Sequence, residues 1–87
     1  MLLEKVISMN SLQQLTKDLY ASAAFLWAGS TLAVVTQMDG WYWVRLYTGD
    51  DRIFGNRVRP DLASTIALLA QAGVPADRGW VAWQPTQ

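Results

Sequence analysis

The sequence predicts a small α+β domain: a mainly antiparallel sheet of three to four strands with two helices, in the order α-β-β-β-α-β. Two observations carry this prediction. The hydrophobic period changes from helical to strand-like near Gly29 and returns to helical near Pro60. Between these points, Asp39-Gly40 joins two apolar runs. This dipeptide favours a β-hairpin, because a type I′ turn needs positive φ at both central residues.

Length and composition limit the possible architectures. The 87 residues are the size of one domain, so residues 1–87 are expected to fold as a single unit. Apolar residues make up 52% and charged residues 16%, which makes the chain too apolar to be disordered. Five tryptophans are unusual in so short a chain. They either fill a core or form an exposed apolar surface that binds a partner.

The first helix is expected near residues 11–28. Ser11 followed by Gln14 fits a capping box. The apolar face would be formed by residues at helical spacing, namely Leu12, Leu15, Leu19, Ala23 and Leu26. Residues 19–38 carry no charge over a length that could cross a bilayer, but Gly29 and the change of period there argue against a membrane span. Residues 1–8 fit either a short strand or an arm.

Three strands are expected next, at residues 31–38, 41–47 and 52–58, with a bulge or kink at Gly55-Asn56. The second helix is expected near residues 60–72. Pro60 and Asp61 suit its first turn, and Gly73 ends it. Leu62, Ile66 and Leu69 would form its buried stripe. A last short strand is expected from Gly79 to Gln84.

The most informative stretch is the strand at residues 41–47. Alternation sends Trp41, Trp43, Arg45 and Tyr47 to one face and Tyr42, Val44 and Leu46 to the other. A two-residue turn pairs Met38 with Trp41, Thr36 with Trp43, Val34 with Arg45 and Leu32 with Tyr47, whereas a three-residue loop would change these partners. Both faces are substantially apolar. Either helices cover both faces and all five tryptophans are core, or one face meets a partner.

Catalytic equipment is missing from the sequence. With no cysteine and no histidine, disulfides, zinc fingers, thiolate nucleophiles and imidazole bases are excluded. No glycine-rich phosphate loop is present. Asp39 and the pair Asp50-Asp51 lie at opposite ends of a strand, roughly 20 Å apart at about 3.3 Å per residue, beyond glycosidase spacing. We therefore expect no enzyme, no metal and no cofactor.

These observations predict a small non-enzymatic protein-binding module: an adaptor, an accessory subunit or an inhibitor of a larger complex. Short, cofactor-free inhibitors encoded by phages have this general character. The expected contact residues are Trp41, Trp43, Arg45 and Tyr47, because tryptophan, tyrosine and arginine are enriched at binding hot spots. The partner is another protein or a second copy, and we expect a homodimer, since exposed apolar patches mark interfaces.

Two alternatives remain open. One is single-stranded nucleic acid, stacked on tryptophan and tyrosine and held by Arg52, Arg57 and Arg59. Seven basic and seven acidic residues cancel, also locally within residues 39–61, which disfavours this alternative. The other is a small-molecule pocket lined by tryptophan. The N-terminus lacks the order of a signal peptide, and we expect a cytoplasmic protein without a membrane span.

Overall fold

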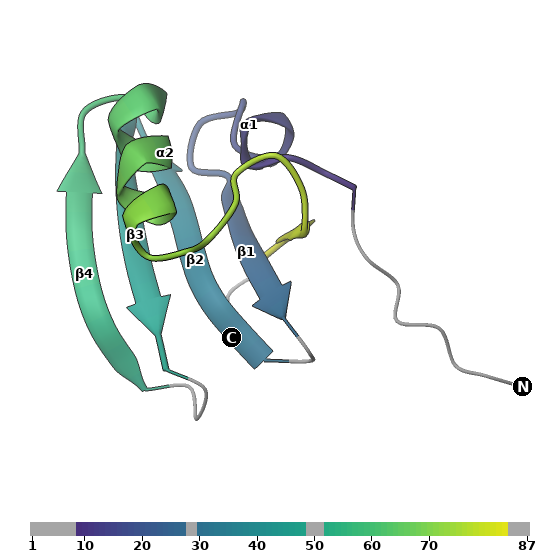
Figure 1. Cartoon of the computed structure of the whole chain (residues 1–87). Coiled ribbons are helices and arrows are strands. Elements are labelled where there is room, and N and C mark those ends of the chain that lie inside the picture. The colour runs from purple at the N-terminus through teal and green to yellow at the C-terminus, as the bar shows by residue number, and fades with distance from the viewer. Residues whose placement is uncertain (1–8, 28–29, 49–51, 84–87) are drawn as a thin grey trace, which may run out of the picture.

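A five-stranded antiparallel sheet, in the order β4-β3-β2-β1-β5, is the centre of the computed structural model, which describes residues 9–27, 30–48 and 52–83 (Figure 1). The elements are α1 (Leu12–Leu15), β1 (Ser22–Trp27), β2 (Ser30–Met38), β3 (Trp41–Tyr47), β4 (Ile53–Arg59), α2 (Leu62–Gln71) and β5 (Trp80–Ala82). The small α+β class is confirmed, but the sheet has five strands instead of three to four. In these ranges no helix is long and apolar enough to cross a membrane. Residues 1–8 and Gln84 lie outside the described residues.

The additional strand is β1, which the helix predicted over residues 11–28 concealed. The predicted capping box between Ser11 and Gln14 is present, yet α1 ends at Leu15. Tyr20 then adopts a φ of 61°, a left-handed conformation that does not continue a helix. The prediction of one long helix is therefore wrong, although its start is confirmed.

The burial of β1 explains why its sequence resembles a helix. This strand pairs with β2 on one side and β5 on the other. Three consecutive residues, Ala23, Ala24 and Phe25, are buried, so both faces of the strand are covered. A strand buried on both faces has a continuous apolar run, and periodicity alone does not distinguish such a run from a buried helix.

The β2–β3 hairpin has the predicted turn and register. Asp39 and Gly40 have φ values of 53° and 94°, the signs that a type I′ turn requires. The predicted pairs that the structure contains are Met38 with Trp41, Thr36 with Trp43 and Val34 with Arg45. The irregularity expected at Gly55-Asn56 lies directly before Gly55. There the β3–β4 register shifts between Gly55 and Ile53.

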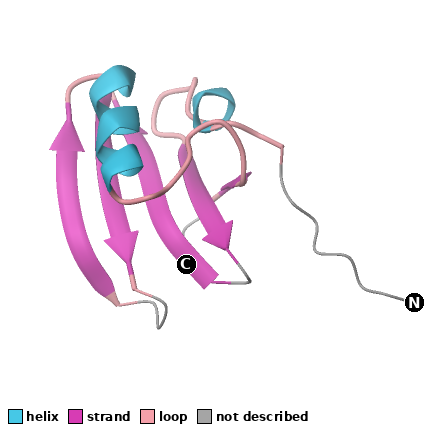
Figure 2. Ribbon diagram, viewed as in Figure 1, coloured by secondary structure: helices cyan, strands magenta, loops and turns pink. Residues whose placement is uncertain are grey.

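Both helices and the segment that joins α2 to β5 lie on one face of the sheet (Figure 2). Leu12 of α1 and Leu69 of α2 belong to the same core cluster as Val44 and Trp80. The Trp80 ring lies 5.7 Å from that of Phe25, and its indole N–H donates to the Pro75 carbonyl over 2.8 Å. The interpretation in which helices cover both faces is therefore wrong for the described part of the chain.

The second helix is confirmed, as are two of the three residues of its predicted stripe, since Leu69 is buried and Leu62 packs against the core. Asp61 is its N-cap, and Gly73 with a φ of 80° follows its last turn. Thr65 and Leu69 are fully buried, whereas Ile66 is 39% exposed, so the predicted role of Ile66 in the core is wrong. The helix is turned so that Thr65 faces the sheet, and its hydroxyl donates to the Asp61 carbonyl over 2.8 Å.

Replacing Gly79 by alanine is expected to destabilise the domain more than replacing Gly73. Both residues have φ near 80°, so alanine costs about 1–2 kcal/mol of left-handed strain at either position. A Cβ at Gly79 would also collide with the Phe25 ring, whereas one at Gly73 meets nothing within 4 Å. The collision adds about 1–3 kcal/mol. Urea unfolding of G79A and G73A measures the difference, and equal losses would contradict the close approach of Phe25.

Replacing Asp61 by asparagine is expected to change how stability depends on pH. Hydrogen bonds from the Ser64 hydroxyl at 2.6 Å and the Ser64 backbone N–H at 2.8 Å lower the pKa of Asp61 below its ordinary 3.8. Because the folded pKa is depressed, this stabilisation is present above pH 3.8 and is lost as the pH falls through the folded pKa.

Asparagine also caps helices but does not ionise. D61N should therefore melt below the wild type at neutral pH, and the gap should close in acid. Thermal unfolding over a pH series measures this convergence. A gap that stays constant down to the acid end of the series would refute the role of the Asp61 charge.

Candidate protein-binding face

The face of the sheet that is opposite the helices carries the aromatic residues of β3. Tyr42, Val44 and Leu46 pack into or against the core, so the alternating residues of β3 project to the other side. We define the aromatic face as the side chains of Trp41, Trp43, Arg45 and Tyr47 together with their cross-strand partners. The structure thus brings together all four residues predicted to bind a protein. No described helix covers them.

Exposed apolar side chains lie at neighbouring positions of this face on three strands. Trp41 is 54% exposed, and its partner Met38 on β2 is also exposed. Val58, paired with Trp43, and Ile53, paired with Tyr47, are exposed on β4. Side chains that are paired across strands lie about 4.5–5.5 Å apart at Cβ, so each of these residues lies beside a member of the aromatic face and extends its apolar patch. Such patches on soluble proteins mark interaction sites.

The centre of the aromatic face is fixed by polar contacts of Trp43. Its indole N–H donates to the side-chain oxygen of Asn56, and the Arg45 guanidinium carbon lies 5.1 Å from the centre of its ring. Trp43 and Arg45 are half-buried. The Nε of Arg45 is buried and has no hydrogen-bond partner among the described residues. Arg45 is therefore held in place by packing and by a cation–π contact, while its own donor remains unsatisfied.

A groove of about 560 Å³ runs beside Trp43 and Arg45. It is bordered by Tyr20, Met38 and Trp83, and Ser22 and Thr36 also line it. The two hydroxyl oxygens lie 2.7 Å apart in a hydrogen bond. We name it the Arg45 groove, because Arg45 is the one charged side chain among the described residues that line it.

Sequence reasoning missed Tyr20, Ser22 and Trp83 as part of this groove. It placed Tyr20 and Ser22 in a helix, and so did not bring them beside Thr36. In the turn before β1, the residue with a positive φ is Tyr20, where a glycine or asparagine is usual. The usual signal for a turn is therefore absent. Trp83 enters the groove because its backbone N–H donates to the Ser22 carbonyl over 2.9 Å.

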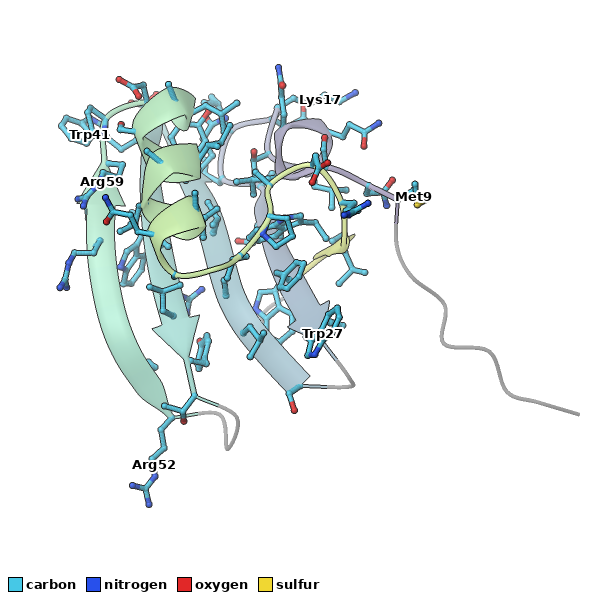
Figure 3. All side chains as sticks on the ribbon, viewed as in Figure 1. Met9, Lys17, Trp27, Trp41, Arg52 and Arg59 are labelled. Carbon is cyan, nitrogen blue, oxygen red and sulfur yellow. The ribbon has the colours of Figure 1, made fainter. Side chains whose placement is uncertain are left out.

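The tryptophans divide into four groups, so the alternative in which all five are core is wrong. Trp80 is fully buried. Trp41 and Trp43 belong to the aromatic face, and half-buried Trp83 lines the Arg45 groove. Trp27 is 67% exposed and lies at the end of the sheet away from Trp41 (Figure 3).

The arginines of the nucleic-acid alternative do not join the aromatic face. Arg57 pairs with Val44 and Arg59 pairs with Tyr42, so both project from the helix-covered side of β4. Arg52 and Arg59 lie at opposite ends of that strand (Figure 3). A nucleic-acid strand stacked on Trp43 would therefore contact Arg45 but none of the other three arginines. In the described ranges, no three acidic side chains gather to hold a metal ion.

No family model, no curated protein and no solved structure matches this chain. The function is accordingly argued from the chemistry of the aromatic face, since a fold by itself does not define an activity.

Replacing Arg45 by methionine is expected to leave stability nearly unchanged. The substitution removes a cation–π contact of about 0.5–1 kcal/mol. It also removes an unsatisfied buried donor, whose desolvation costs about 1–3 kcal/mol. We therefore expect the free energy of unfolding of R45M to change by less than about 1 kcal/mol or to rise.

Urea unfolding measures the effect, with V44A as the matched control on the same strand. Val44 is fully buried in the core, so its truncation should destabilise by about 1–3 kcal/mol. If R45M lost as much as V44A, Arg45 would be a structural residue.

Proposed function

We propose that this chain is a small non-enzymatic protein-binding module, whose aromatic face takes another protein or a second copy of itself. One observation carries the proposal. Both helices lie on one face of the sheet, and the opposite face presents Trp41 exposed beside half-buried Trp43 and Arg45. Tryptophan, tyrosine and arginine are the residues that dominate binding energies at interfaces.

The fixed geometry of the face supports this role. Binding costs less when the contact side chains already hold their bound conformation. The hydrogen bond to Asn56 orients the Trp43 ring, and that ring in turn lies under the Arg45 guanidinium. Trp41 adds a large apolar side chain at the edge of this preformed centre. Such an arrangement suits an adaptor, an accessory subunit or an inhibitor that docks on a larger complex.

The edge strand β4 supports a protein partner over a small ligand. Ile53 and Val58 extend the apolar patch as far as this edge of the sheet. A partner that covers the patch would bury side chains from three strands together. A small molecule in the Arg45 groove is the second candidate, favoured by a volume of about 560 Å³, which lies within the range of about 300–1,000 Å³ for ligand pockets. A small molecule in this groove would leave the exposed side chains of Trp41, Val58 and Ile53 uncovered.

Replacing Trp41 by alanine is expected to weaken binding by about 30-fold or more, the loss of a hot-spot residue worth about 2 kcal/mol. The matched control is W27A. Trp27 is also exposed but lies at the other end of the sheet, so its loss should leave binding unchanged. Because neither side chain is buried, both variants should keep the stability of the wild type.

The measurement has two arms. Sedimentation at micromolar concentration reports self-association. Capture from the native source followed by mass spectrometry identifies a partner, whose affinity for wild type, W41A and W27A is then measured by calorimetry. A monomer that retains no protein, or equal losses in W41A and W27A, would refute the aromatic face as the binding site.

A further inference from the structure

Arg45 has a position that folding alone does not explain. It is half-buried opposite Val34, which is itself fully buried, and a methionine or leucine would pack there without a polar group. The Arg45 Nε is buried without a hydrogen-bond partner, and the side chain forms no ion pair with any residue in the described ranges. Among the guanidinium nitrogens only Nε is buried without a partner, so an external acceptor would bind the two terminal nitrogens of Arg45.

The charge around Arg45 favours an anion. Arg45 is the one charged side chain among the described residues of its groove. Asp39 lies in the β2–β3 turn, five residues along β2 from the Arg45 partner Val34, or roughly 17 Å at about 3.3 Å per residue. That distance is about twice the screening length of about 8 Å at physiological salt. The lining of the groove therefore offers a carboxylate one cation and no acid, and Lys17 and Asp18, which are of opposite charge, lie just before the lining residue Tyr20 in the chain.

The remaining walls of the groove describe what should accompany the carboxylate. Ser22 and Thr36 hydrogen-bond to each other, and each hydroxyl retains capacity for a further bond. Met38, Tyr20 and Trp83 provide apolar surface on the sides. An acidic group next to an aliphatic or aromatic side chain would match both kinds of surface.

The groove is continuous with the exposed patch, which favours a protein segment as its occupant. Met38 lines the groove and pairs across the strands with Trp41. A chain that places an acidic residue at Arg45 can therefore continue over Trp41 without leaving the surface. Nucleic acid would bring repeated phosphates, but Arg57 and Arg59 project from the opposite face of the sheet.

We propose that the Arg45 groove binds an acidic residue flanked by an apolar side chain in a segment of the partner protein. This inference rests on the proposed function and specifies the chemistry of the partner. The carboxylate accepts charge-assisted hydrogen bonds from the Arg45 guanidinium, which the Trp43 ring holds in position. The neighbouring apolar side chain packs between Met38 and Trp83.

The probe is a displayed library of random peptides, selected against the immobilised wild-type chain. We expect the enriched peptides to carry aspartate or glutamate next to an aliphatic or aromatic residue. A synthetic enriched peptide should bind R45Q about 10-fold or more weakly, the loss of a hydrogen bond to a charged group. Replacing the acidic residue of the peptide by its amide should weaken binding to the wild type by the same factor. It should weaken binding to R45Q little further, because the two changes remove one interaction.

R57Q is the matched control, since it removes a charge from the opposite face and should bind like the wild type. Urea unfolding of R45Q checks that this variant is folded. The enriched peptides could lack an acidic residue and still bind the W41A variant more weakly than the wild type. That result would overturn the Arg45 inference and leave the proposed function standing. Peptides insensitive to both W41A and R45Q, or no enrichment, would refute both. If free indole-3-acetate bound as tightly as the peptide, the ligand of the groove would be a small carboxylate and the proposed protein segment would be wrong.

Discussion

The register of the β2–β3 hairpin determines which side chains become core and which face outward. Because Asp39 and Gly40 form a two-residue turn, Val44 enters the core, while Trp43 and Arg45 project from the other face. Side chains alternate along a strand, so a slip of one residue would exchange the partners of every side chain on β3. The helix packing and the aromatic face both depend on this turn.

The parts of the fold that local chemistry determines could be predicted from the sequence. The Asp39-Gly40 turn, the Ser11 capping box and the Asp61 helix start each rest on a few adjacent residues. The four aromatic-face residues followed from alternation within β3. β1 could not be predicted in this way, because its apolar run results from neighbours on both faces and both edges. Alanine favours helices in isolation, but pairing with β2 and β5 outweighs that preference.

The missed strand also explains why the placement of the helices was left open. The predicted sheet of three to four strands would be roughly 10–14 Å wide at about 4.8 Å between strands, little more than the diameter of one helix, so two helices could cover both of its faces. The five strands observed span roughly 20 Å. Two helices then cover one face only, α1 near β1 and β5 and α2 over β3 and β4 (Figure 1). The open face is a geometric consequence of the wider sheet that β1 completes.

Composition distinguishes this open face from an ordinary solvated one. Antiparallel sheets that face water on one side usually carry polar residues there. Here that side carries Trp41, Trp43 and Tyr47 on the central part of the sheet, with Val58 at its edge. Arg45, the charged member, leaves a buried donor unpaired instead of extending into water. Sequences agree with their folds at most positions and depart from local rules mainly at functional sites. The departures gather on the face that no described helix covers, while Trp80 and Leu69 stabilise the opposite face.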